Sequence, residues 1–252
     1  MICCTLLVMM FIIALLSLST YAAALNQSFE TTPRPKCIVF DLDGTLWNRP
    51  RFRKGPPFAP VECGAKGVRA ASGEVLDLYP DVRGIFQSFK GDIGSGSDKN
   101  SGDEFGAVQV AFISRGHRPE WAKSFLELLS VESSRPLDGL NDDEIESNSL
   151  ISVMDYCDAL VIRDGSKARL HLRDVSRFLN VDRNEMLFFD DRLHEVQDAE
   201  SIGGVVGVHC PNGLTWKIFH DGIAKFARRR GSKNKQLRGR VKRRGSAGVG
   251  RG

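Results

Sequence analysis

Short apolar runs alternate with amphipathic segments along the middle of the chain. Five runs have the length of buried strands, at residues 37–40, 107–113, 158–162, 185–189 and 204–208. Segments with apolar residues at helical spacing lie between and after them, at 80–89, 119–131, 168–179, 194–202 and 214–229. Because strands that alternate with helices form parallel sheets covered on both faces, this pattern predicts an α/β fold with a doubly wound parallel sheet.

A stretch rich in proline and glycine follows the first apolar run. Its content of these residues excludes a long helix, and its alternating apolar positions predict a small β-hairpin flap at about residues 50–78. A flap here caps the carboxyl end of the first strand. The flap residues Arg51, Arg53, Lys54 and Phe58 either line a substrate entrance or belong to a solvated loop.

Two polar stretches interrupt the alternation of strands and helices. Residues 91–106 are rich in Gly, Ser and Asp, with little to bury, and residues 132–152 are centred on the string NDDEIES. With 252 residues and 42% apolar content, the chain suits one domain with appendages. We therefore interpret both stretches as insertions in a single domain of residues 36–228.

The first 24 residues have the character of a targeting segment. An apolar run from Ile2 to Leu16 is followed by Ala22-Ala23-Ala24, which is typical of a cleaved signal peptide that directs the chain into the secretory pathway. The first positive charge, Arg34, follows the apolar run, and positive charges on that side suit a signal anchor whose domain lies in the cytosol. An organelle-targeting leader is the third alternative, and a cytoplasmic protein is expected if the leader is not used. Residues 25–35 form a linker.

The cysteines and the charges restrict the function classes further. Cys3 and Cys4 lie in the leader, and Cys37, Cys63, Cys157 and Cys210 show no C-x-x-C spacing, so we expect neither a zinc site nor a disulfide framework. Residues 225–252 contain 12 of the 35 basic residues and no acidic residue. The rest of the chain therefore has 23 basic and 31 acidic residues. The segment 229–252 is predicted to be a basic disordered tail. It could bind nucleic acid or an acidic membrane surface, act as a targeting signal, or simply be solvated.

Polar residues follow four of the predicted strands within a few positions. They are Asp41 and Asp43, Ser114 and Arg115, Lys167, and Asp190 and Asp191. Because the carboxyl ends of parallel strands meet at one edge of a sheet, we expect these side chains to converge. From the residues alone, Asp41 could attack phosphorus or hold a metal while Asp43 moves a proton, or the pair could simply form an Asp-Gly turn.

Several local strings resemble one known family. The strings FDLDGTLW, PPF, LYPDV, SRG, GSK and FFDDR are similar to those of the haloacid dehalogenase-like hydrolases, and in particular to the magnesium-dependent phosphatase type one family. The resemblance covers roughly residues 36–228. It implies the Rossmann-like fold of that superfamily, with the flap as its cap. Gly44 stands where the family often has Tyr, a departure that restores the pattern of the broader superfamily.

The resemblance implies a catalytic role for each of the matching residues. Asp41 attacks the phosphoryl group to form an aspartyl-phosphate, and Asp43 protonates the leaving group and then accepts a proton from water. Lys167 stabilises the negative charge of the transition state. Ser114 and Arg115 bind the phosphoryl group, and Thr45 positions the nucleophile by hydrogen bonding within the loop.

The resemblance also implies a magnesium site. Mg2+ is held by Asp41, by Asp43 through its backbone carbonyl and by Asp191, with Asp190 supporting the site without touching the metal. The five histidines match no motif of the family, so we interpret them as structural or surface residues.

Two function classes remain from the sequence. The first is a Mg2+-dependent phosphomonoester hydrolase, acid phosphatase or protein tyrosine phosphatase-like, that acts as a monomer on phosphotyrosine-like or sugar-phosphate substrates. The second is a nucleic-acid-binding protein that uses its basic tail, with the phosphatase fold as a scaffold. The complete set of Asp41, Asp43, Lys167 and Asp191 favours the hydrolase, because a scaffold has no need of it.

Overall fold

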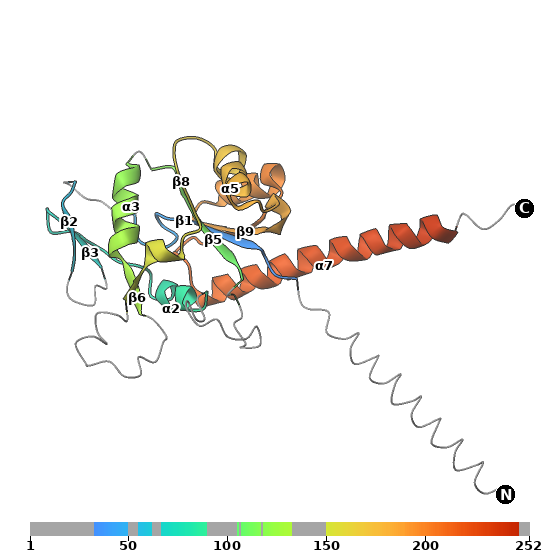
Figure 1. Ribbon diagram of the computed structural model, residues 1–252, viewed down its shortest axis with the longest axis horizontal. Helices are drawn as coiled ribbons and strands as arrows, with labels where there is room; N and C mark the ends of the chain where they lie inside the picture. Colours follow the sequence, from blue (N-terminus) through green and yellow to red (C-terminus); the bar gives the residue numbers. More distant parts are fainter. Residues whose placement is uncertain are drawn as a thin grey trace, which may run out of the picture. The chain divides into compact units, whose positions relative to one another are not determined.

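A five-stranded parallel sheet forms the centre of the computed structural model (Figure 1). The structure describes residues 33–49, 55–61, 67–89, 105, 107–116, 118–132 and 150–246. The five strands are β1 (Cys37–Asp41), β5 (Gln109–Ser114), β8 (Ala159–Ile162), β9 (Met186–Asp190) and β10 (Val206–His209). Their order in the sheet is β10-β9-β1-β5-β8. The predicted parallel sheet is therefore confirmed, and the predicted leader and most of the linker lie outside the described residues.

Strand β1 is the central strand, and all five of its residues are buried. It pairs in parallel with β5, where Asp41 lies opposite Ile113, and with β9, where Phe40 lies opposite Phe189. Since all of these strands run in the same direction, their carboxyl ends form one edge. The polar residues that follow each strand are thereby brought to this edge.

Alternating side chains of the central strands fill two separate cores. On one face, Phe40, Phe112 and Phe189 pack with residues of α2 (Val82–Gln87), α3 (Pro119–Leu128) and α7 (Trp216–Ser246). On the other face, Val39, Ile113 and Phe188 pack with Leu172 and Val175 of α5 (Leu172–Leu179). Strands covered on both faces read as continuous apolar runs, which is why the sequence revealed them clearly.

Short helical turns complete the helical layers. They are η1 (Val153–Tyr156), η2 (Lys167–His171), η3 (Arg183–Glu185), α6 (Leu193–Asp198) and η4 (Ala199–Gly203). The predicted helix at 168–179 is divided into the π-helical turn η2 and α5, and the predicted helix at 194–202 is divided into α6 and the π-helical turn η4.

The predicted flap is a three-stranded antiparallel sheet and not a two-stranded hairpin. Its strands are β2 (Phe58–Pro60), β3 (Val68–Ala70) and β4 (Val75–Leu76), in the order β2-β3-β4. Phe58 packs edge-on against Trp121 and Phe125, so it attaches the flap to α3 beside it (Figure 1). Phe58 therefore supports the flap. The neighbouring Arg51, Arg53 and Lys54 lie outside the described residues.

The two insertions carry more structure than the sequence indicated. Strands β6 (Ser130–Glu132) and β7 (Leu150–Ser152) pair antiparallel where the second insertion begins and ends. Near the end of the first insertion, Phe105 is only 3% exposed and contacts Phe89 and Phe219. The expectation that this insertion has little to bury is therefore wrong for Phe105.

Helix α7 extends through most of the segment that was predicted to be a disordered tail. The predicted end of the helix was residue 229, whereas α7 continues to Ser246. Arg229 donates to the carbonyl of Val205, and Arg230 forms an ion pair with Glu185. These contacts dock the helix on the domain, and the Lys, Arg and Gln residues beyond them have high helix propensity. Of the helices that the structure describes, none is both long and apolar enough to cross a membrane.

We expect Phe219→Ala to lower the free energy of unfolding by about 3–5 kcal/mol. The Phe219 ring is fully buried and stacks against Phe189, so its removal leaves a cavity between α7 and the sheet. Phe178→Ala is the matched control, because Phe178 is also helical but 73% exposed, and its cost should stay below about 0.5 kcal/mol. Urea unfolding measures both variants. Equal small costs would contradict the docking of α7 on the sheet.

Candidate active site

The chain closes a tight loop directly after β1. The backbone N–H groups of Thr45 and Leu46 donate to the carbonyl of Leu42, at 3.1 and 2.9 Å. The indole N–H of Trp47 donates to Oδ1 of Asp43 at 2.7 Å, and Trp47 itself is fully buried. This hydrogen bond holds the carboxyl group of Asp43 at the mouth of the loop, two residues after the buried Asp41.

A buried ion-pair network joins three of the strand ends. The ammonium group of Lys167 lies 2.6 Å from Oδ1 of Asp41 and 2.6 Å from Oδ2 of Asp190. Lys167 is 2% exposed and comes from η2, where the Ser166 hydroxyl accepts a hydrogen bond from the backbone N–H of Arg169. The predicted convergence of Asp41 and Lys167 at one edge of the sheet is thus present in the structure.

Asp190 and Asp191 have different surroundings although they are adjacent. Both oxygens of Asp190 are engaged, Oδ2 by Lys167 and Oδ1 by the backbone N–H of Arg192 at 2.8 Å. Asp191 accepts a hydrogen bond from Arg49 on Oδ2, but its Oδ1 is buried without a hydrogen-bond partner among the described residues. A buried carboxylate oxygen without a partner is costly, so this atom has the character of a ligand atom.

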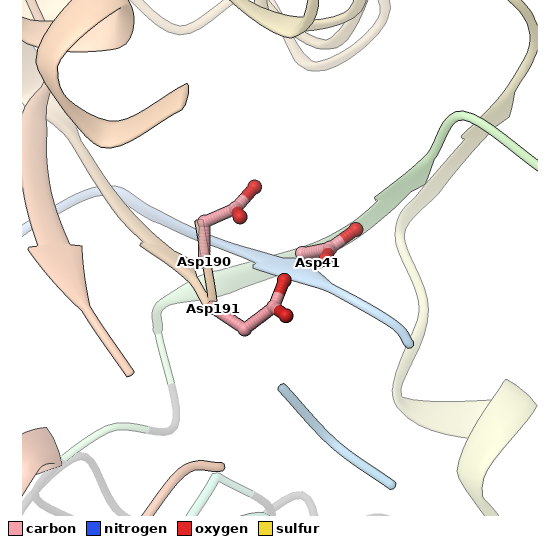
Figure 2. A group of neighbouring side chains, drawn as sticks. All are labelled: Asp41, Asp190 and Asp191. Carbon is pink, nitrogen blue, oxygen red and sulfur yellow. The ribbon is translucent and has the colours of Figure 1, made fainter. Parts of the chain in front are cut away.

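The three carboxylates form a cluster that suits a divalent cation (Figure 2). One oxygen atom from each of Asp41, Asp190 and Asp191 lies within 4.8 Å of the others. Carboxylate oxygens are the ligands that hard cations such as Mg2+ prefer. Because Asp190 is already hydrogen-bonded through both oxygens, Asp41 and Asp191 are the two side chains best placed to hold the metal.

Burial controls the protonation of these groups. It raises the pKa of Asp41 to about 7, against the opposing effect of the Lys167 ammonium, and it also raises the pKa of Asp190. For Lys167, burial lowers the pKa, but the carboxylates of Asp41 and Asp190 outweigh it and the net pKa is raised. Lys167 is therefore cationic, and a further cation at the cluster favours ionised Asp41.

Asp43 is suited to hold a proton. Burial raises the pKa of its carboxyl group, and the hydrogen bond from Trp47 and the charge of Arg49 only partly oppose this. A carboxyl group with a raised pKa is a better general acid near neutral pH than an exposed one. The two carboxyl groups thus differ in their partners, because Asp43 accepts a hydrogen bond from Trp47 whereas Asp41 is paired with the ammonium group of Lys167.

A cavity of about 420 Å³ opens in front of Asp41. Its lining consists of Asp41, Asp43, Ser114, Arg115, Gly116, Asp164, Gly165, Lys167 and Arg192. Ser114 ends β5 and is 5% exposed, and its hydroxyl oxygen accepts a hydrogen bond from the backbone N–H of Gly116 at 3.2 Å. The predicted phosphate-binding serine therefore faces the same cavity as the predicted nucleophile.

Two of the predicted substrate-binding residues, Arg115 and Thr45, form contacts within the protein, and their predicted role stays a prediction. Arg115 lines the cavity, but its guanidinium forms a 2.9 Å ion pair with the buried Glu195. Thr45 is fully buried, has a hydroxyl without a partner among the described residues, and is absent from the cavity wall. Its backbone carbonyl accepts a hydrogen bond from the backbone N–H of Leu214 at 2.9 Å, which holds Thr45 within the loop.

Three further residues lie around the site, and none of them was assigned a role in it from the sequence. His171 is fully buried, and its Nε2 lies 2.8 Å from the carbonyl oxygen of Arg163 and 3.1 Å from that of Ser114. It therefore joins the ends of β5 and β8, in agreement with its interpretation as a structural histidine. Arg49 contacts Asp191, and Arg192 lines the cavity. Only the position of Arg192 directly after Asp190-Asp191 could have indicated its proximity to the site.

Comparisons with known proteins agree with this geometry. The family model described as Acid Phosphatase matches residues 33–229. The chain is 28% identical to a HAD-like hydrolase superfamily protein of Schizosaccharomyces pombe over 67% of this chain and 82% of the relative. It is 26% identical to Magnesium-dependent phosphatase 1 of Homo sapiens over 77% of this chain and 88% of the relative.

A solved structure with a phosphatase domain is also similar. It is the N-terminal part of a Bacteroides fragilis protein, complexed with Mg, with 18% identity and a TM-score of 0.37. The similarity covers 75% of this chain and 40% of that one.

Replacing Gly44 with Ala tests the contact between the loop and the carboxylate cluster. Gly44 has a φ of +90°, and a Cβ there would lie 2.5 Å from Oδ2 of Asp191. We expect Gly44→Ala to weaken the binding of a divalent cation about tenfold or more, because Asp191 must move. Isothermal titration calorimetry measures this affinity.

Gly73→Ala is the matched control for this prediction. Gly73 has a φ of +91° but no atom within 4 Å of its Cβ position, so it shares the backbone strain without the clash. Its cation affinity should equal that of the unmodified chain. Equal affinities in both variants would show that the clash at Asp191 is harmless.

Proposed function

The chain belongs to the acid phosphatase family and is a phosphatase of the haloacid dehalogenase type, and we propose that it hydrolyses phosphomonoesters through an aspartyl-phosphate on Asp41. One observation carries this proposal. Asp41, at the end of the central strand, is nearly buried, is paired with a lysine and faces a cavity that also contains a carboxylic acid and a serine. These are the parts that covalent phosphoryl transfer requires.

In the first step, a carboxylate oxygen of Asp41 attacks phosphorus and the bond to the leaving oxygen breaks. Asp43 donates its proton to that oxygen, so the product leaves as an alcohol or a phenol. Lys167, at 2.6 Å from Asp41, orients the nucleophile and stabilises the negative charge of the transition state. The Ser114 hydroxyl and the backbone N–H groups that follow it bind the phosphoryl oxygens.

In the second step, water attacks the aspartyl-phosphate. Asp43, now ionised, accepts a proton from this water, and the bond between phosphorus and Asp41 breaks to release inorganic phosphate. One acid thereby serves both halves of the reaction. The hydrogen bond from Trp47 keeps the carboxyl group of Asp43 in one position throughout.

Magnesium fits the carboxylate cluster, in agreement with the magnesium in the name of the human relative. Asp41 and Asp191 would hold it, together with the backbone carbonyl of Asp43 that the family resemblance implies. When bound, the ion would supply Lewis-acid chemistry that offsets the negative charge of a phosphoryl group. Asp190 instead fixes Lys167 and the backbone of Arg192.

The finer features of the function are part of the proposal. Phosphotyrosine-like and sugar-phosphate esters are the expected substrates, and a cavity of about 420 Å³ accommodates molecules of that size. We further propose a monomer that enters the secretory pathway through its leader. Binding of nucleic acid by the basic segment, with an inactive scaffold, has no support in the comparisons and stays a prediction.

Hydrolysis of p-nitrophenyl phosphate tests the proposed reaction. Turnover should require Mg2+, stop with EDTA, and fall about a thousandfold or more in Asp41→Asn, because the amide is a poor nucleophile. Asp198→Asn is the matched control: Asp198 is exposed and lies outside the cavity lining, so its turnover should be unchanged. Turnover that survives in a folded Asp41→Asn protein would refute the covalent mechanism.

A second pair of variants separates the roles of the adjacent aspartates. Asp191→Asn should raise the Mg2+ concentration needed for half-maximal rate about tenfold or more, because it removes a ligand charge. Asp190→Asn should mainly lower kcat at saturating Mg2+, because Lys167 loses one of its two partners. Calorimetric Mg2+ titrations of both variants complete the measurement. The reverse order of the two effects would make Asp190 the direct ligand.

A further inference from the structure

The cavity has a buried floor and a more exposed rim. The floor is made by Asp41, Lys167 and Ser114, which are 4%, 2% and 5% exposed. Arg115 and Arg192 are half-buried, and Asp164 and Gly165 are exposed. Because phosphorus must come within bonding distance of Asp41, the phosphoryl group occupies the floor. The rim then faces the remainder of the substrate.

The cations that line the cavity differ in their partners. Lys167 is shared between Asp41 and Asp190, and Arg115 is paired with Glu195. The guanidinium of Arg192 has neither an ion pair nor a hydrogen bond within the part of the chain that the structure describes. Its backbone N–H, however, donates to Oδ1 of Asp190 at 2.8 Å. This hydrogen bond fixes the backbone of Arg192 beside the cluster, and none of the described carboxylates forms an ion pair with its guanidinium.

We propose that Arg192 selects phosphomonoesters that carry a second anionic group, a carboxylate or a second phosphate. An arginine presents a planar set of donors that matches such groups in a bidentate manner. Lys167 and Ser114 on the floor already bind the phosphoryl group. Arg192 at the rim therefore contacts the other end of the substrate. The inference rests on the proposed function, because it takes the phosphoryl group to lie at Asp41.

The shape and charge of the rim restrict where this second group lies. Asp164 is an exposed acidic residue of the rim, so the side of Arg192 is the more favourable place for a second anion. A cavity of about 420 Å³ leaves room for a short carbon chain between the two anionic groups. A small phosphorylated acid therefore matches the cavity better than a neutral alkyl phosphate.

Binding of non-hydrolysable phosphonates tests the inference without any turnover. The probes are 3-phosphonopropionate and 4-phosphonobutyrate, each compared with its neutral amide, titrated calorimetrically into the full chain with Mg2+. At least one acid should bind about tenfold more tightly than its amide. Arg192→Gln should remove that preference, and Arg192→Lys should keep part of it.

Arg169→Gln is the matched control, because Arg169 is exposed and does not line the cavity, and it should keep the full preference. The inference is overturned if neither acid binds more tightly than its amide, or if Arg192→Gln keeps the preference for the acid. It is also overturned if Arg192→Gln weakens the binding of acids and amides equally, because Arg192 would then contact the phosphoryl group. No measurable binding of any probe overturns it too. The proposed function fails by a different measurement, the absence of p-nitrophenyl phosphate turnover.

Discussion

The contact of Lys167 with two buried carboxylates is the interaction on which the site depends. Three carboxylates at one sheet edge repel one another. If they were buried without a cation, they would either take up protons or destabilise this edge of the sheet. Lys167 is 2.6 Å from both Asp41 and Asp190, and it is itself almost inaccessible to solvent. It therefore holds β1 and β9 together at their ends, and the same charge is available for catalysis.

The arrangement of the remaining groups follows from this pairing. Because Asp190 is engaged through both of its oxygens, Asp191 is left with a buried oxygen that has no protein partner among the described residues. The loop after β1 brings Gly44 against this carboxylate, so closely that a side chain at position 44 would displace it. A glycine is thus required by the space beside Asp191 as well as by its positive φ.

In the proposed mechanism, the reaction takes place at the buried floor of the cavity, and the rest of the substrate is recognised at its rim. The buried floor holds Asp41 and Lys167 as an ion pair, which is the arrangement that the proposed reaction requires. The rim is more exposed, and there the two arginines differ: Arg115 is paired with Glu195, whereas the guanidinium of Arg192 has no ion pair among the described residues. The proposed preference for substrates with a second anionic group rests on this difference.

The sequence by itself determined the parallel sheet, the strand ends that carry Asp41, Ser114, Lys167 and Asp190, and the family to which the chain belongs. These features depend on local patterns, since a buried strand reads as an apolar run and the polar residue after it marks its end. The tertiary structure alone decided the partners. Arg115 meets Glu195, and the arginines of α7 meet Glu185 and Val205, across long sequence separations. No local pattern encodes such contacts, because they depend on where packing places each element.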